Sequence, residues 1–358
     1  MKTGFVESRD APAAARAAPT LGLKAGARVR VRSKEEILRT LDSEGKLEGV
    51  PFMPEMLRHC GEEFPVRARA HKVCDTIEWN QYRRMENAVH LAELRCDGSA
   101  HGGCDAGCLL FWKEAWLTPV EDGEDVSPAA ASVDTLEGEA SISEEDLVRS
   151  TEVGVNDKGQ TLYSCQATEV LRATEGPLKW WEPTQYVEDV KSGNSTVPRV
   201  VRALLVGAFN RFQEASKRFL PRFLRIQGGK RYPFIKGTAP RGETSEETLG
   251  LQPGELVEIK SKEEIFATLD DEDKTQGLRY DSEMLQYSGR RARVVRRIER
   301  IIDEDSGRML RIKRDTVVLE GVICTGRYHR SCPRAIYPYW REAWLKRVDP
   351  APEPAGEA

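Results

Sequence analysis

The stretch LGLKAGARVRVRSKEEILRTLD, residues 21–42, returns later in the chain as LGLQPGELVEIKSKEEIFATLD, residues 249–270. The match continues outward: residues 21–120 align with residues 249–348 without a gap, at a constant offset of 228 positions. An ungapped match of this length is typical of a duplicated domain, and the offset is far longer than the repeat of a solenoid. The sequence therefore predicts two homologous modules, module 1 (residues 21–120) and module 2 (residues 249–348), which flank an insert.

Each module is expected to consist mostly of strands. In module 1, Gly26 precedes the alternating run RVRVR, as a turn that leads into a strand would. Ser33 and Glu36 follow with the Ser-x-x-Glu pattern of a capping box, which starts a short helix. Module 2 repeats these signals at the aligned positions. We therefore predict an α+β, mainly β fold with two small SH3-like, partly open barrel modules and a central helical segment.

The segments outside the modules differ in composition. Residues 1–20 and 349–358 are expected to be a disordered lead-in and a disordered tail. Residues 121–159 are acidic, rich in small residues and free of aromatic residues, which predicts a disordered linker. Residues 160–248 are predicted to fold as a helical insert.

One long helix is expected within the insert, over residues 198–220. Apolar residues at helical spacing define one of its faces. They are Val201, Leu204, Leu205, Ala208, Phe209, Phe212, Phe219 and Leu220. The other face is basic and carries Arg199, Arg202, Arg211, Lys217 and Arg218. We expect the apolar face to pack on a module; the alternative is a basic helix that docks on a membrane or on a partner.

The composition is that of a polar globular protein. Of the 358 residues, 39% are hydrophobic and 31% are charged. No apolar run reaches the roughly 18 residues of a membrane span. The start of the chain lacks the apolar region of a secretory signal, which predicts a cytoplasmic protein in a reducing compartment. The formal net charge of −4 argues against nucleic acid as a general partner, and leaves a protein partner or a small-molecule substrate open.

The segment CDGSAHGGCDAGC, residues 96–108, concentrates the ligand-type residues of module 1. They are Cys96, His101, Cys104 and Cys108, interleaved with glycines that let a short loop turn tightly around an ion. Together with Cys74 from a neighbouring strand, the three cysteines would complete a tetrahedral site, with His101 as a substitute ligand or as the hydrogen-bond partner of one. Zinc is the first expectation, with iron or an iron–sulfur cluster as the alternative. The competing interpretation is a set of buried core cysteines.

Module 2 keeps part of this pattern. Cys324, His329 and Cys332 recur in register, whereas isoleucine replaces the other two cysteines of the expected site. A degenerate site would leave the three residues as packing residues. A functional site would bind metal through this Cys2His set with a fourth position open to water or substrate, as catalytic metals require. Cys165, or a group from the other module, is a further candidate for the fourth ligand.

The segments SKEEI-x-x-TLD and C-x-G-x-x-H-x-x-CPRAIYPYWREAWL resemble a family of bacterial proteins with one or two copies of such a Cys/His-containing module. The resemblance covers both modules. It implies a bacterial, cytosolic setting, and it carries over no activity.

Three functional hypotheses follow. The sequence has no Walker loop, dinucleotide-binding glycine motif, His-Glu-x-x-His helix or Gly-x-Ser-x-Gly elbow. The first hypothesis is therefore an accessory or binding protein with a structural metal in module 1. The second is an iron- or zinc-dependent enzyme, such as an oxidoreductase in the biosynthesis of specialised metabolites, with its open site in module 2. The third is a nucleic-acid binder that uses a run of arginines, namely Arg290, Arg291, Arg293, Arg296, Arg297 and Arg300.

Overall fold

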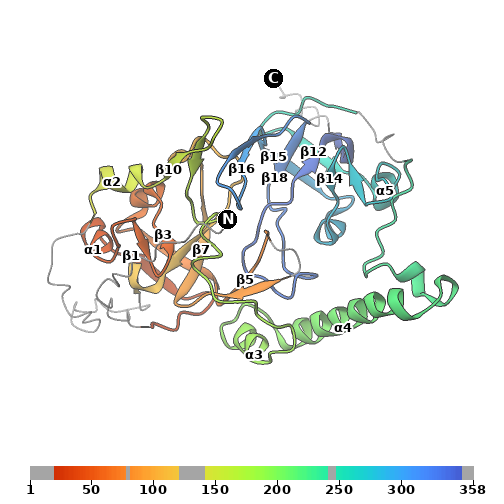
Figure 1. Ribbon diagram of the computed structural model, residues 1–358, viewed down its shortest axis with the longest axis horizontal. Coiled ribbons are helices and arrows are strands. Elements are labelled where there is room, and N and C mark those ends of the chain that lie inside the picture. Colours follow the sequence, from red (N-terminus) through yellow and green to blue (C-terminus); the bar gives the residue numbers. More distant parts are fainter. Residues whose placement is uncertain (1–19, 78–80, 121–141, 241–246, 349–358) are drawn as a thin grey trace, which may run out of the picture.

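The computed structural model describes residues 20–77, 81–120, 142–240 and 247–348 and shows a mainly β molecule. Each module contains one five-stranded sheet. The two sheets lie in opposite halves of the molecule, and the helical part of the insert runs along one edge (Figure 1). The expected mainly β fold class is confirmed at this level. None of the described helices has the length and hydrophobicity of a membrane span.

The sheet of module 1 has the strand order β8-β7-β4-β1-β9, and all its strand pairs are antiparallel. Its strands are β1 (Arg28–Val31), β4 (Glu63–Arg69), β7 (Ala88–Arg95), β8 (Leu109–Lys113) and β9 (Leu117–Pro119). The shorter elements are α1 (Lys34–Leu38), β2 (Lys46–Leu47), β3 (Val50–Pro51), η1 (Pro54–His59), β5 (Lys72–Cys74), β6 (Tyr82–Arg84) and η2 (Glu114–Trp116).

The sheet of module 2 has the matching order β19-β18-β15-β12-β20. Its strands are β12 (Leu256–Ile259), β15 (Arg291–Arg297), β18 (Thr316–Leu319), β19 (Trp340–Arg341) and β20 (Leu345–Arg347). The shorter elements are α5 (Lys262–Phe266), β13 (Lys274–Thr275), β14 (Leu278–Arg279), η5 (Ser282–Tyr287), β16 (Arg300–Ile302), β17 (Met309–Arg311) and η6 (Glu342–Trp344). Most of these elements begin at positions that align with those of module 1.

Aligned residues start the same helix in both modules. The side chain of Ser33 accepts a hydrogen bond from the backbone N–H of Glu36, whose carboxylate accepts one from the backbone N–H of Ser33. Ser261 and Glu264 form the same reciprocal pair. Both capping boxes are therefore confirmed, and each satisfies two backbone donors that a helix start otherwise leaves unpaired.

Aligned aromatic residues also build both cores. In module 1, Trp116 is fully buried and meets the ring of Phe52 edge to face, with 5.0 Å between centroids. In module 2, Trp344 and Tyr280 repeat this contact at 5.2 Å. Such a pair contributes about 1 kcal/mol beyond the apolar area that it buries.

A buried carboxylate ties the start of each module to its end. Glu114 accepts hydrogen bonds from the backbone N–H groups of Leu21, Gly22 and Leu23 at 2.6, 3.1 and 3.2 Å. Glu342 binds the three aligned N–H groups of module 2 in the same way. These bonds offset the cost of burying the charge.

The acidic linker is shorter than expected, because residues 142–159 are ordered. They contain α2 (Glu144–Arg149) and β10 (Glu152–Val155), which pairs with β11 (Thr161–Tyr163). Ser143 caps α2, and Leu147 is buried in the core of module 1, so this acidic stretch gains a cap and an apolar anchor. The remaining linker residues, 121–141, lie outside the described residues, as do residues 1–19 of the expected lead-in and the expected tail, residues 349–358.

The insert contains α3 (Thr184–Lys191), α4 (Val197–Phe219), η3 (Arg222–Leu224) and η4 (Ile226–Gly229). The long helix is confirmed, but the expected packing of its apolar face on a module is wrong. The helix buries Val200, Ala203, Gln213 and Ser216 instead. Gln213 is buried because its side-chain amide donates hydrogen bonds to the carbonyls of Ile226 and Lys230, at 2.9 and 2.8 Å. Of the expected apolar face, Val201, Leu205, Phe212 and Phe219 are exposed, whereas Leu204, Phe209 and Leu220 are half-buried.

Candidate metal centre

The two modules meet through reciprocal contacts of their cysteine loops. The backbone N–H of Cys74, at the end of β5 in module 1, donates to Sγ of Cys332 at 3.2 Å. The backbone N–H of Ile302, at the end of β16 in module 2, donates to Sγ of Cys104 at 3.4 Å. Cys74 aligns with Ile302 and Cys104 with Cys332, so one contact mirrors the other. Both β5 and β16 lie between the two sheets (Figure 1).

Arginines fix this interface. Arg334 of module 2 donates to the carbonyl of Cys74 at 3.0 Å, and the guanidinium of Arg330 lies 3.8 Å from the ring centroid of Tyr82. In the other direction, Arg95 of module 1 lies 3.9 Å from the ring centroid of Tyr337. Cation–π contacts this close hold side chains in one geometry. Each cysteine loop is therefore positioned by the opposite module.

The candidate metal group of module 1 is Glu55, Cys96 and His101. Their ligand atoms lie within 4.8 Å of one another, and all three residues are buried. Sγ of Cys96 is 3.3 Å from Nε2 of His101, and Oε1 of Glu55 is 4.0 Å from Nδ1. Within the described part of the chain, neither oxygen of Glu55 nor Nδ1 of His101 has a hydrogen-bond partner. Buried polar atoms rarely lack a partner, so this group is incomplete as it stands.

Gly98 makes the loop between the two ligands possible. Its φ is +76°, and a Cβ there would come within 2.2 Å of the backbone of Cys104. The Gly98 carbonyl accepts hydrogen bonds from the N–H groups of His101 and Gly103 at 3.2 and 2.9 Å. Only glycine fits this turn, which returns the histidine towards Cys96. The expected tight turn at a glycine is confirmed at this position.

Burial governs the protonation of the group. It raises the pKa of Glu55 and of Cys96, and it lowers the pKa of His101 to about 4. Without an ion, burial therefore shifts all three side chains towards their neutral forms. A divalent cation reverses this preference for the acid and the thiol, because metal ligands bind in their deprotonated forms. A neutral imidazole is already suited to bind a metal.

The aligned group of module 2 is Glu283, Cys324 and His329, again with ligand atoms within 4.8 Å of one another. Here the carboxylate is fully occupied. Glu283 accepts hydrogen bonds from the backbone N–H groups of Thr325 and Tyr328 at 3.0 and 2.5 Å, and from the Thr325 hydroxyl at 2.8 Å. The cysteine loop of module 2 is therefore held by hydrogen bonds to this carboxylate.

The histidine of module 2 is also occupied. Nδ1 of His329 lies 3.4 Å from Sγ of Cys324, and Nε2 lies 3.3 Å from a carboxylate oxygen of Asp281. Burial opposes the charged form of His329, but the bonds to Asp281 and Cys324 outweigh it and hold the pKa of His329 well above its usual value. The residue of module 1 that aligns with Asp281 is Met53, whose side chain is uncharged.

The predicted ligands are only partly brought together. Cys96 with His101, and Cys324 with His329, do meet, but the four-thiol site predicted from Cys74, Cys96, Cys104 and Cys108 is not assembled among the described residues. Cys74 lies beside Cys332 because β5 reaches into module 2. Cys108 and Cys165 pack against the core of module 1, and Cys104 and Cys332 accept backbone hydrogen bonds from the opposite module. Of these seven cysteines, Cys96 and Cys324 are the two that belong to a three-ligand group among the described residues.

The sequence interpretation missed the carboxylates. Glu55 and Glu283 lie in the aligned helices η1 and η5, far in sequence from the cysteine loops. One signal pointed to them: a glutamate stands at the same position in both modules. Both are buried, which is rare for glutamate unless it is paired.

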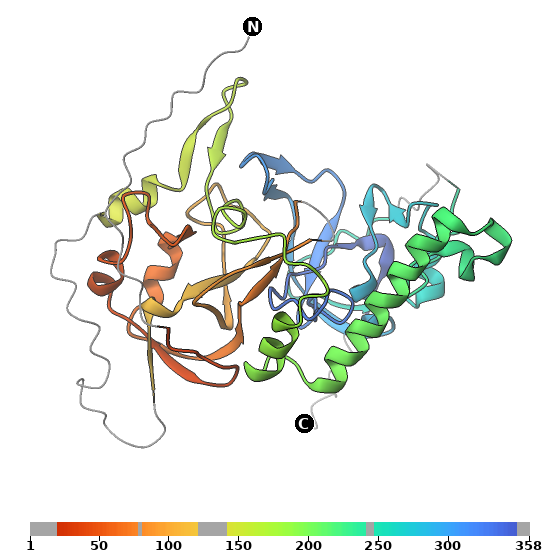
Figure 2. The same ribbon diagram turned by 60° about the horizontal axis from the view of Figure 1, so that its bottom comes forward.

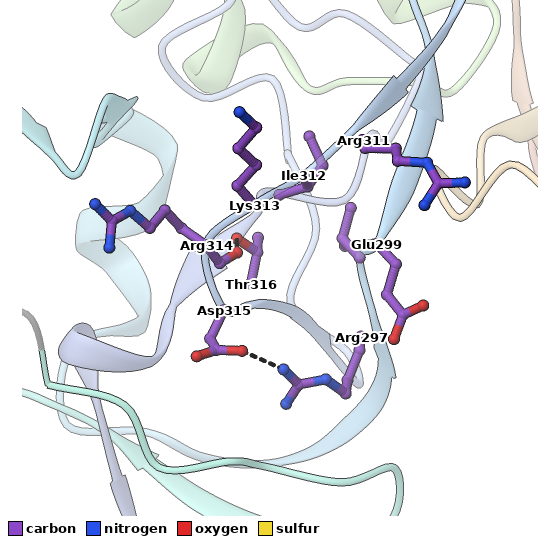
Figure 3. Close-up of a pocket in the computed structure, with 9 residues that line it drawn as sticks. Arg297, Glu299, Arg311, Ile312, Lys313, Arg314, Asp315 and Thr316 are labelled. Carbon is purple, nitrogen blue, oxygen red and sulfur yellow. Dashed lines mark hydrogen bonds and ion pairs between the residues drawn. The ribbon is translucent and has the colours of Figure 1, made fainter.

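The arginine run of module 2 mostly binds the protein itself. Arg297 pairs with Asp315 at a hollow of about 390 Å³ (Figure 3). It also donates to the carbonyl of Leu251 at 2.7 Å. Arg293 donates to the carbonyl of Gly254 at 2.9 Å. The hollow is lined by residues 297–299 and 311–316, none of which is a candidate ligand. These internal contacts weaken the case for the nucleic-acid hypothesis, since bonded arginines have less to offer a phosphate.

Comparisons with known proteins found no matching family model, no similar curated protein and no similar solved structure.

Proposed function

We propose that the protein is an accessory or binding protein in which module 1 holds one structural divalent ion, zinc in the first place, through Glu55, Cys96 and His101. The observation that carries this proposal is the buried group itself, in which the Glu55 oxygens and Nδ1 of His101 lack hydrogen-bond partners among the described residues. Each unpaired buried polar group costs about 1–3 kcal/mol. A bound cation would remove much of this cost.

The chemistry of the three side chains suits zinc. Cysteine, histidine and glutamate are its usual protein ligands. Three of them leave one tetrahedral position for water, an arrangement more usual in catalytic than in structural zinc sites, so the structural assignment rests on burial. The burial of the group keeps substrates away from the ion, which favours a structural role over catalysis. Iron as a single ion is the second choice. An iron–sulfur cluster has less support, because it needs about four thiolates and this group has one.

An enzyme with an open Cys2His site in module 2 is the second candidate function. One observation favours it: the His329 side chain is 37% exposed, whereas that of His101 is 1% exposed. Two observations oppose it. Asp281 and Glu283 already occupy the polar atoms of this group, and Cys332 accepts its hydrogen bond from Cys74 of module 1. We therefore propose that the group of module 2 is held together by hydrogen bonds and does not bind a second ion.

We also propose that each module is a small SH3-like, partly open barrel. The support is a five-stranded antiparallel sheet that brings its first and last strands together: β1 pairs with β9, and β12 pairs with β20. The modules would then act as a binding scaffold joined by their cysteine loops.

Thermal unfolding of chelator-treated protein tests the proposal. Zinc at about a hundred times its dissociation constant stabilises the folded state by about 2.7 kcal/mol, which should raise the melting temperature by roughly 5 °C or more. We expect this shift in the wild type and in Glu283→Gln, and its loss in Glu55→Gln. The two variants change aligned residues by the same chemistry. Equal shifts in both variants, or no shift in the wild type, would contradict the proposal.

A further inference from the structure

Helix α4 carries an exposed apolar ridge along its outer side. Val197, Val201, Leu205, Phe212 and Phe219 follow one another at spacings of four or seven residues, which at about 100° per residue keeps them on one face. Leu205 is 67% exposed, Phe212 50% and Phe219 76%. The ridge extends over the full length of the helix, which lies at the outside of the molecule in both views (Figures 1 and 2).

The apolar surface continues past the end of α4. Phe223, Leu224 and Ile226, in η3 and η4, are also exposed, and Phe223 is the most exposed large apolar residue described. Exposed apolar residues scattered singly need no explanation, but a continuous ridge of this length marks an interaction surface.

Positive charge surrounds the ridge. Residues 197–231 contain nine arginines and lysines and one glutamate, a local charge of +8 in a chain whose formal net charge is −4. On the helical projection Arg211 and Arg218 border the ridge on one side and Arg202 borders it on the other. The single acidic residue, Glu214, pairs with Arg231. The surface is thus apolar along its crest and cationic along both flanks.

We propose that α4 and the segment after it dock on an anionic lipid surface, with the ridge among the lipid head groups and the flanking arginines on their phosphates. An amphipathic helix with a basic polar face and Leu and Phe on the other face binds membranes in this way without spanning them. A second copy of the chain fits less well, because pairing two ridges would bring two surfaces of charge +8 together.

Vesicle flotation with the full chain tests the inference. We expect binding to phosphatidylcholine vesicles that contain phosphatidylglycerol, and little binding to phosphatidylcholine alone. Leu205→Ser/Phe212→Ser should lose binding, and Arg211→Glu should weaken it at least about fivefold, since each cation near an anionic surface contributes about that factor. The matched controls Val153→Ser/Val155→Ser and Lys158→Glu alter equally exposed residues on and next to β10 and should bind as the wild type does.

Several outcomes would overturn the inference. Absence of binding to the anionic vesicles is one, and equal binding to neutral and anionic vesicles is another. A third is a dimer in solution, measured by light scattering, that dissociates in Leu205→Ser/Phe212→Ser. Circular dichroism of each variant checks that α4 still folds, and Arg211→Glu, which leaves the ridge intact, separates lost charge from lost structure.

Discussion

The two modules carry the same three side chains in the same places, yet only one group has unpaired polar atoms. In module 2 the Thr325 hydroxyl donates to Glu283. The aligned residue of module 1 is Asp97, which has no proton to donate and instead binds Arg58 at 2.6 Å. Glu55 is therefore left without the partner that its counterpart has. This difference of residue type accounts for one of the missing hydrogen bonds; the two backbone N–H groups that bind Glu283 also have no counterpart at Glu55.

A second difference acts in the same direction. Asp281 engages the imidazole of His329, whereas the aligned Met53 offers no such contact and Nδ1 of His101 has no hydrogen-bond partner among the described residues. The comparison teaches that a ligand pattern in sequence does not define a metal site. The surrounding donors and charges decide whether the ligands remain available.

The largest effect on stability is expected at β5 of module 1, which differs from the aligned strand β16 of module 2. Lys72 of β5 is fully buried and pairs with the equally buried Asp189 of α3 at 2.5 Å. The aligned Arg300 of β16 is exposed, and its side chain donates to the carbonyl of Gly102 at 3.3 Å. Asp189→Asn should lower the free energy of unfolding by about 3–5 kcal/mol, because it leaves a buried charge unpaired.

Arg300→Met is the aligned control and should change the free energy of unfolding by less than about 1 kcal/mol. Urea denaturation measures both variants. A small effect of Asp189→Asn would show that the insert does not anchor β5 through this pair.

A middle-sized effect is expected from giving module 1 the residues of module 2. Met53→Asp/Asp97→Thr should supply Glu55 and His101 with hydrogen-bond partners and so lower zinc affinity by about 10–100-fold. Competition with a coloured chelator measures the affinity. Asp281→Asn/Thr325→Val alters the aligned positions of module 2 and should leave zinc affinity unchanged. The interpretation of the two differences fails if both double variants bind zinc like the wild type.

The smallest effect, counted per pH unit, is expected in the pH dependence of the metal-free protein. Burial lowers the pKa of His101 from 6.5 to about 4, so the unfolded chain binds the proton first as the pH falls. The free energy of unfolding should therefore decrease between about pH 6.5 and 4, by up to about 1.4 kcal/mol per pH unit. For His329, whose folded-state pKa is raised, the contribution is full below pH 6.5 and is lost as the pH rises through that higher pKa.

Nuclear magnetic resonance titration of the ring protons distinguishes the two histidines, with His101→Gln and His329→Gln for assignment. We expect His101 to be neutral and His329 to be protonated at pH 7. If the pKa values of both histidines lie above 6.5, or both lie below it, the expected difference between the modules is contradicted.

The features that could be predicted from the sequence depend on residues that lie close together in the chain. The capping boxes of Ser33 and Ser261 and the turn at Gly98 follow from local hydrogen bonding and backbone geometry. The helical face of α4 follows from residue spacing. Spacing, however, says which residues share a face and not what lies against it, so the outward turn of Leu205 and Phe212 was not predictable.

The rest of the site depends on contacts between distant segments. Cys74 meets Cys332 only because β5 reaches across to the other module. Glu55 joins Cys96 through packing of η1 on the loop after β7, which no periodic pattern records. Alignment of the two modules shows a glutamate at both positions. The glutamates become candidate ligands only once the structure shows that they are buried.

Metal content of the purified protein tests the central claim most directly. Elemental analysis of the wild type, Cys96→Ser and Cys324→Ser, all prepared under reducing conditions, compares the aligned thiols of the two modules. The account predicts one zinc per chain in the wild type and in Cys324→Ser, and none in Cys96→Ser. Loss of the metal with Cys324→Ser but not with Cys96→Ser, or a wild type without metal, would contradict it.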